Sequence, residues 1–198
     1  MLGLIKQVHP IRFNQTSTSI VPNYIDAAVV QLDGALGSNV YPSPIPHDSV
    51  ILGKHVNTAP IFDFTDIGDL NNQNICIKIG ARTGRLPLSP DSEYAPADGD
   101  VTGVVDDVDY ATTVRYMTGS VEDEWTATFL HCIRIKLNNY SATSSPSWRF
   151  SDGGDSGSCV WIWIPARNRW EILGLVFAGG GTEGDARSIV CRIDYIMK

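Results

Sequence analysis

The chain has 198 residues, of which 43% are hydrophobic and 19% are charged, a composition typical of a globular protein. The length suits one ordinary domain or two small barrels. The net charge of −7, without a cluster of Lys or Arg, argues against a nucleic-acid partner, because a phosphate backbone would be repelled. No apolar run approaches the roughly 20 residues that a membrane-spanning helix needs, so a membrane partner is not expected either.

Short β-rich runs separated by Gly, Pro, Asn, Asp and Ser dominate the chain, and no long segment keeps a helical period. Only the last residues, Asp194–Lys198, are predicted to begin a helix. Many short strands separated by turns indicate an all-β sandwich or barrel. The predicted strands are Tyr24–Leu32, Ile75–Ile79, Val101–Val105, Ala111–Met117, Thr126–Leu137, Ser158–Ile164, Trp170–Phe177 and Ser188–Ile193.

Two segments are predicted to be long connections. Residues 34–60 are rich in proline and have few periodic apolar residues, which indicates a linker between two structural units. Residues 138–155 form a loop rich in Ser, Asn and Gly that leads directly into Ser156. Long loops in compact domains are often functional.

The four cysteines are spaced far apart, each inside an apolar run, and no zinc-type Cys-x-x-Cys pair occurs. Buried free thiols are the favoured interpretation, and one or two disulfides remain open. No metal and no cofactor is expected. The residues concerned are Cys76, Cys132, Cys159 and Cys191.

The segment with the clearest chemical pattern is residues 153–158 (GGDSGS), which lies between the polar loop and a strong strand. Glycines let the backbone turn tightly and bring N–H groups close to a substrate carbonyl. Ser156 would then be an exposed nucleophile, with the N–H groups of Gly154 and Ser156 as an oxyanion hole. A plain surface turn is the alternative interpretation of the same residues.

Further segments make the chain resemble the chymotrypsin-like (trypsin-fold) serine peptidases over residues 15–198. Residues 23–30 (NYIDAAVV) are similar to the family's segment around the triad aspartate. Residues 78–84 (KIGARTG), followed by Gly103-Val104-Val105, resemble the opening of the second barrel in bacterial and fungal members. Residues 173–180 (LGLVFAGG) resemble the strand that lines the substrate cleft, and the order Asp then Ser agrees with the family.

The resemblance implies a chymotrypsin-like antiparallel β-barrel fold with a partial first barrel and a complete second barrel. The first would be a remnant at residues 1–35 carrying Asp26, the linker would occupy 36–70, and the second barrel would be 71–198 with Ser156. The implied activity is that of a serine endopeptidase that cleaves peptide bonds of a peptide or protein substrate through an acyl-enzyme on Ser156. Asp26 would orient a histidine, and Asp155 would be buried to hold the oxyanion loop, although the sequence identifies no partner for it.

The resemblance also assigns substrate-binding residues. Phe150, six residues before the serine, would lie at the base of the primary pocket and make it shallow, whereas nearby Asp152 would instead attract a basic side chain. Phe177, Ala178 and Gly179 would form the cleft wall, where an extended substrate adds as a strand. Ordinary core packing is the alternative for Phe177.

The family's catalytic histidine has no clear counterpart. His9 is the only histidine before Asp26, and Pro10 directly after it disfavours the short helical turn expected there. His47 and His55 fall in the proposed linker, and His131 falls in a predicted strand, where packing is expected. Asp26 orients a base and cannot replace it, so this chain alone is expected to be weakly active or inactive.

Three hypotheses follow from the missing base. In the first, the chain is incomplete, and an N-terminal partner fragment supplies the catalytic histidine. In the second, catalysis has been lost, and the chain is a peptidase-like protein-binding module. In the third, the chain is a plain β-barrel interaction domain in which Asp26 and Ser156 lie far apart.

Two other groups allow both a functional and a structural interpretation. Trp161, Trp163 and Trp170 would form a ligand patch or, as we favour, pack in the core. The acidic residues at 106–109 and 122–124 would hold a cation or, more simply, lie in solvated loops, because calcium-loop spacing is missing.

Overall fold

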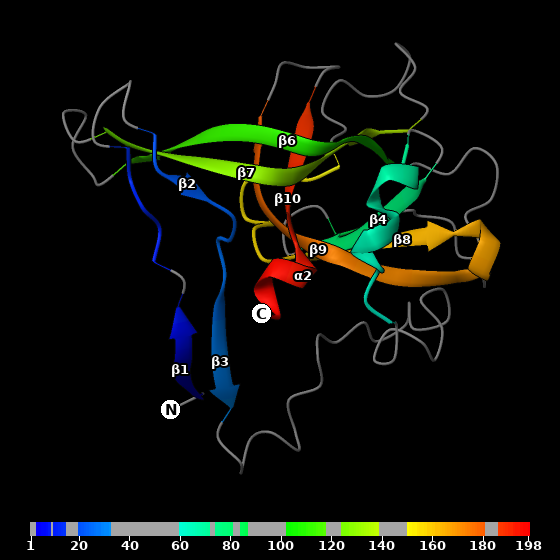
Figure 1. Ribbon diagram of the computed structural model, residues 1–198, viewed down its shortest axis with the longest axis horizontal. Helices are drawn as coiled ribbons and strands as arrows, with labels where there is room; N and C mark the ends of the chain where they lie inside the picture. The colour runs from blue at the N-terminus through cyan, green and yellow to red at the C-terminus, as the bar shows by residue number, and fades with distance from the viewer. Residues whose placement is uncertain are drawn as a thin grey trace.

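The computed structural model describes residues 3–8, 10–14, 20–32, 60–71, 74–80, 84–86, 102–117, 124–138, 150–180 and 186–198. These residues are mostly β-strand, which confirms the all-β prediction (Figure 1). In the described part of the chain, no helix is long and apolar enough to span a membrane.

The described residues form ten strands and three short helical segments. The helical ones are the 3-10 helices η3 (Phe64–Asp69) and η4 (Pro165–Arg167) and one short terminal helix, α2 (Ile193–Ile196). The strands are β1 (Gly3–Val8), β2 (Pro22–Asn23), β3 (Ala28–Leu32), β4 (Ile75–Gly80), β5 (Gly84–Leu86), β6 (Gly103–Met117), β7 (Glu124–Leu137), β8 (Cys159–Ile164), β9 (Arg169–Gly180) and β10 (Arg187–Arg192).

Six strands form a closed circuit of antiparallel pairings. The order is β10-β9-β8-β4-β6-β7, and β10 pairs with β7 as well as with β9, so the path returns to its start. β5 adds to β4, and β2 adds to β7 in parallel. β1 and β3 form a separate two-stranded sheet, drawn in blue in Figure 1. Because the path closes, each of the six strands pairs with a neighbour on both sides, and none of them is an edge strand.

The core explains why the strands lack a simple alternation of polar and apolar residues. In β8, Val160 and Ile162 belong to one buried cluster together with Ile133, Leu173 and other apolar side chains. The intervening Trp161 and Trp163 pack on the opposite face, against Ile77 and Trp170. Because both faces of the strand are covered, the sequence reads as an uninterrupted apolar run. The packing interpretation of the tryptophans is therefore confirmed.

Most predicted strands are confirmed, and the differences have local causes. The two strands expected at Val101–Val105 and Ala111–Met117 are one continuous strand, β6, because register shifts between Val105 and Thr112 absorb the interruption. The strand expected from Tyr24 begins only at Ala28. β1, β2 and β5 were not predicted; β2 contains Pro22, which gives no strand signal, and its pairing to β7 is a tertiary contact.

The N-terminal segment is anchored to β7 by the side chain of Asn23, which is 6% exposed. Its amide nitrogen donates hydrogen bonds to the carbonyls of Thr128 (3.0 Å) and Arg12 (2.9 Å), and its oxygen accepts the Arg12 N–H (2.8 Å). The Asn14 N–H adds a bond to the Thr126 carbonyl at 2.8 Å. These bonds hold the segment that leads to Asp26 against the main sheet.

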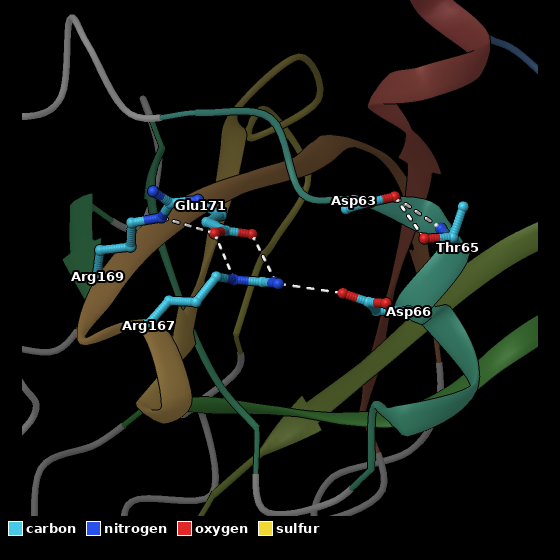
Figure 2. A network of polar contacts seen from close by, with 6 residues as sticks. All are labelled: Asp63, Thr65, Asp66, Arg167, Arg169 and Glu171. Carbon is cyan, nitrogen blue, oxygen red and sulfur yellow. Dashed lines mark hydrogen bonds and ion pairs between the residues drawn. The ribbon is translucent and has the colours of Figure 1, made fainter.

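Residues 60–70, which the sequence assigned to a linker, pack against β9. Backbone hydrogen bonds join Pro60 and Phe62 to Ile172 at 2.8 and 2.9 Å. Phe62 is 2% exposed and belongs to the main apolar cluster. A polar network adds to this contact: buried Glu171 binds Arg167 and Arg169, and Arg167 reaches Asp66 of η3 at 3.1 Å (Figure 2). The contact between Arg167 and Asp66 therefore joins η4 to η3, which are about 100 positions apart in sequence.

Candidate active site

The Ser156 loop, residues 150–158, is held in one conformation by its own hydrogen bonds. The Asp155 N–H donates to the Asp152 carbonyl at 3.0 Å, and the Asp152 N–H returns a bond to Asp155 Oδ2 at 3.0 Å. The Gly157 N–H donates to the Val176 carbonyl at 2.7 Å, which fixes the loop to β9. Gly154 and Gly157 have φ angles of 101° and 88°, so glycine is required at both turns.

A buried ion pair lies beneath this loop. Lys78 Nζ of β4 is 3.1 Å from Asp155 Oδ2, and both side chains are fully buried. Burial lowers the pKa of Lys78, while the hydrogen bond and negative charge of Asp155 oppose this effect. Lys78 is therefore the partner that sequence analysis could not find for Asp155. The sequence did indicate that Lys78 has a partner, because a lysine in the middle of the apolar strand ICIKIG has to be paired if its neighbours are buried.

Gly80 makes room for this ion pair. A Cβ atom on Gly80 would lie 2.2 Å from Asp155 Oδ1 and 2.8 Å from Lys78 Nζ. Gly80→Ala is expected to displace the Asp155 carboxylate and to lower the free energy of unfolding by roughly 1–3 kcal/mol. Urea denaturation would measure the change. Gly153→Ala is the matched control in the Ser156 loop, because nothing lies within 4 Å of its Cβ. Equal stability of the two variants would contradict the described contact.

The hydrogen bonds within the loop do not use the two N–H groups proposed for the oxyanion hole. The N–H groups of Asp152, Gly153, Asp155, Gly157 and Ser158 all donate within the chain. Within the described residues, those of Gly154 and Ser156 have no acceptor. Both residues are exposed, as is the Ser156 side chain. A pair of exposed donors on either side of a buried, ion-paired Asp155 is suited to bind a negatively charged oxygen.

A cavity of about 140 Å³ adjoins Ser156. Ala178 and Gly179, which the sequence analysis assigned to substrate binding, line this cavity, and so does Asp152. Phe150 does not line it: its ring is 1% exposed in the core, where a Cβ on Gly103 would approach it to 2.5 Å. Phe177 also turns inward, with its ring 4.8 Å from that of Phe129, so the core alternative describes its position.

Asp26 is held by groups from two strands of the circuit. Its Oδ2 accepts a hydrogen bond from the Tyr116 hydroxyl at 2.9 Å, and its N–H donates to Cys191 Sγ at 3.3 Å. Burial and the charge of Asp26 raise the pKa of Tyr116, so the phenol stays protonated and donates. Within the described residues, Oδ1 of Asp26 accepts no hydrogen bond, and it is available to orient a further group.

Asp26 and the Ser156 loop contact neighbouring positions of β9 and β10. Cys191, which binds Asp26, pairs with Leu175 of β9. The next residue, Val176, accepts the N–H of Gly157. The two predicted catalytic residues therefore approach the same stretch of sheet although 130 positions separate them in sequence.

The only histidine in the described part of the chain is His131, and it is engaged elsewhere. Its Nδ1 contacts Asp109, and its ring stacks on Tyr24 with centroids 5.6 Å apart. It does not line the cavity beside Ser156. His9, His47 and His55 lie outside the described residues.

The cysteines and the acidic run have structural partners. No disulfide joins the four cysteines, which agrees with the favoured prediction, and burial raises the pKa of Cys191 to about 12. Asp106 binds Arg134, Lys136 and Arg187, and Asp107 lies 3.8 Å from Arg134. The acidic residues at 122–123 lie outside the described part of the chain.

No protein-family model matches this chain, and no curated protein matches it in sequence. The function therefore has to be inferred from the arrangement of the residues around Ser156.

Proposed function

We propose that the chain carries the nucleophile of a serine endopeptidase of the chymotrypsin-like type, with the closed circuit of strands as its second barrel. The observation that carries the proposal is the Ser156 loop. An exposed serine hydroxyl, two unused N–H groups and a neighbouring cavity lie together, and the buried Lys78–Asp155 ion pair holds them from below. A plain surface turn would not require a fully buried lysine to support it.

In this proposal, Ser156 Oγ attacks the carbonyl carbon of a peptide bond, and its proton passes to a base. The N–H groups of Gly154 and Ser156 stabilise the negative charge that develops on the carbonyl oxygen. The bond to the amine then breaks, the base returns its proton to the leaving amine, and an acyl-enzyme remains on Ser156. Water releases the acyl group in a second, equivalent cycle. No metal is needed for these steps.

The base is a histidine from outside the described residues, oriented by Asp26. The unused Oδ1 of Asp26 would accept the imidazole N–H, while Tyr116 and Cys191 hold the rest of the aspartate in place. A separate N-terminal segment that contributes this histidine would be the physiological partner. Without it, the hydroxyl of Ser156 is a weak nucleophile.

Labelling with a fluorophosphonate tests the proposal. The wild-type chain is expected to become covalently labelled at Ser156, at a rate that rises when free imidazole is added as a substitute base. Intact-mass and peptide-mass spectrometry would locate the label. Ser156→Ala is expected to remain unlabelled, and Ser158→Ala, which removes a hydroxyl two residues away, is expected to label like the wild type. If Ser156 does not label with or without imidazole, the peptidase proposal fails.

One observation favours a second candidate, a peptidase-like binding module without catalysis. Tyr116 already occupies Oδ2 of Asp26, and within the described residues no histidine contacts this aspartate. In that case the cavity beside Ser156 would bind a peptide without cleaving it. Failure of labelling together with measurable peptide binding would select this candidate.

A further inference from the structure

Two of the four free cysteines lie opposite each other where the circuit of strands closes. β10 pairs with β7 in one regular antiparallel register, and the last pair of this ladder is Val190 opposite Ile133. The next residue of β10 is Cys191, and the residue of β7 that corresponds to it in the same register is Cys132. The register therefore places these two cysteines at one cross-strand position.

The clusters of buried residues place both thiols on the same face of the sheet. Successive side chains of a strand point to opposite faces. Val190 and Ile133 both belong to the main apolar cluster, whereas Cys191 and Cys132 both belong to the second cluster, with Ile189. Both cysteine side chains are buried. The two thiols therefore share one apolar environment on one side of the paired strands.

The spacing of such a pair meets the requirement of a disulfide. Opposite residues of antiparallel strands have Cα atoms roughly 4.5–5.5 Å apart, and disulfides join residues whose Cα atoms are about 4.4–6.8 Å apart. Both cysteines are free in the structure. A bond between Cys132 and Cys191 therefore requires rotation of the two side chains and no change in the register of β7 and β10.

The other two cysteines lack this arrangement. Cys76 of β4 and Cys159 of β8 also lie on neighbouring strands, but Cys76 is opposite Ile162. Cys76 belongs to the main apolar cluster, and Cys159 packs against the tryptophan cluster on the other face of the sheet. Cys159 is also the least buried of the four. A reagent that oxidised thiols by exposure alone would therefore react first at Cys159.

Cys191 also anchors Asp26, since its Sγ accepts the Asp26 N–H at 3.3 Å. Burial raises the pKa of Cys191 to about 12, this hydrogen bond opposes the rise, and the neighbouring Cys132 adds to it. The reduced sulfur is therefore a protonated thiol at neutral pH, and it is free to rotate toward the Asp26 N–H. In a disulfide, the sulfur has to lie about 2.05 Å from the sulfur of Cys132. Its position is then set by β7 and no longer by Asp26.

The place of the pair in the fold gives an oxidant access to it. The pair lies just beyond the end of the β7–β10 ladder, next to His131, whose φ angle of 55° departs from extended backbone. The ends of ladders open at a lower free-energy cost than their centres. Burial also raises the pKa of Cys132 to about 12. Because the reactive form of a thiol is the thiolate, we expect oxidation to be slow and limited by local opening.

We infer that Cys132 and Cys191 are an oxidation site, at which hydrogen peroxide converts the two thiols into a cross-strand disulfide and thereby loosens the anchoring of Asp26. One sulfur, as its thiolate, attacks a peroxide oxygen; the O–O bond breaks, water leaves, and a sulfenic acid remains. The second sulfur attacks the sulfenic sulfur, so that the S–S bond forms, the S–O bond breaks, and a second water leaves. The two thiols together lose two electrons and two protons, and the peroxide is reduced to water. This inference goes beyond the proposed function and holds without it, because Ser156 takes no part in the reaction.

Thiol counting and peptide mapping of the whole chain test the site. The protein is treated with hydrogen peroxide at low protein concentration, denatured, and blocked with N-ethylmaleimide. The free thiols are expected to fall from four to two, and a digest without reductant is expected to contain the Cys132 peptide joined to the Cys191 peptide. A phosphine reductant is expected to restore all four thiols. Four unchanged thiols, a disulfide through Cys76 or Cys159, or higher oxidation of Cys159 without the expected disulfide would overturn the inference.

Cysteine variants assign the reaction to the pair. Cys132→Ala and Cys191→Ala are each expected to keep their three remaining thiols under the same treatment, and Cys159→Ala, the matched control, is expected to form the disulfide like the wild type. Thermal unfolding shows whether each variant is folded. The peptide map of the wild-type protein decides the site even where a variant does not fold. Thiol loss in a folded Cys191→Ala variant equal to that in the wild type would contradict the assignment.

Hydrogen exchange tests the effect on Asp26. Amides of residues 24–28 are expected to exchange up to about tenfold faster in the oxidised protein than in the reduced protein, which is the weight of one hydrogen bond. Cys132→Ala treated with peroxide is the control, and its exchange is expected to stay unchanged. Equal exchange in the oxidised and reduced proteins would overturn the loosening of Asp26. Fluorophosphonate labelling of Ser156 is measured separately, and its failure would remove the peptidase while leaving this inference standing.

Discussion

Lys78→Met is expected to lower the free energy of unfolding by about 3–5 kcal/mol, because it leaves the fully buried carboxylate of Asp155 without its cation. This loss is a large part of the stability of an ordinary domain, roughly 5–15 kcal/mol. Chemical denaturation followed by tryptophan fluorescence would measure it. The variant is also expected to lose fluorophosphonate labelling of Ser156, since Asp155 no longer has a fixed position beneath the loop.

A double variant separates stability from site geometry. Lys78→Met with Asp155→Asn removes both charges, and it is expected to recover most of the stability while labelling stays low. Lys136→Met is the matched control: Lys136 is 35% exposed and shares Asp106 with two arginines, so its loss is expected to cost less than about 1 kcal/mol. A loss in Lys78→Met no greater than in this control would contradict a buried ion pair.

Gly174→Ala is expected to lower the free energy of unfolding by roughly 3 kcal/mol. A Cβ on Gly174 would lie 1.9 Å from the carbonyl oxygen of Cys191 and 2.7 Å from the Val190 side chain. The first contact is with backbone, which cannot rotate away, so β9 and β10 would have to separate. Because Cys191 binds the N–H of Asp26, the change would also shift this aspartate.

Hydrogen exchange would locate the effect of Gly174→Ala. Amides of β9 and β10 are expected to exchange faster in this variant than in the wild type. Gly180→Ala is the matched control on the same strand, because nothing lies within 4 Å of its Cβ. If Gly174→Ala and Gly180→Ala unfold at the same denaturant concentration, the close approach of the two strands is not as described.

The candidate site divides into local features that sequence shows and tertiary features that it does not. Ser156 and Gly154 were recognisable because a glycine-rich turn before a strong strand is a local pattern. Phe150 was assigned to the substrate pocket by its distance from Ser156 in sequence, yet its ring is in the core, filling the space over Gly103. A position count along a loop does not report which way each side chain points.

The groups that complete the site come from other strands. Lys78 lies 77 positions from Asp155, and Tyr116 and Cys191 lie 90 and 165 positions from Asp26. Lys78 is marked locally only as a charge inside an apolar strand, and nothing near Tyr116 or Cys191 in sequence indicates its role. Arg134 and Arg187 likewise gather around Asp106 only because β7 and β10 are neighbours across the closure of the circuit. Nothing in the spacing of Arg134 and Arg187 along the chain indicates that they share a carboxylate partner.

The sequence by itself determined the strands and the Ser156 loop, because β-propensity, apolar runs and turn residues act over a few neighbouring positions. The tertiary structure alone decided the buried partner of Asp155, the anchoring of Asp26 and the meeting of Arg134 and Arg187 at Asp106. These features depend on the pairing register of strands that are distant in the chain. A shift of one residue in that register would turn Lys78 away from Asp155.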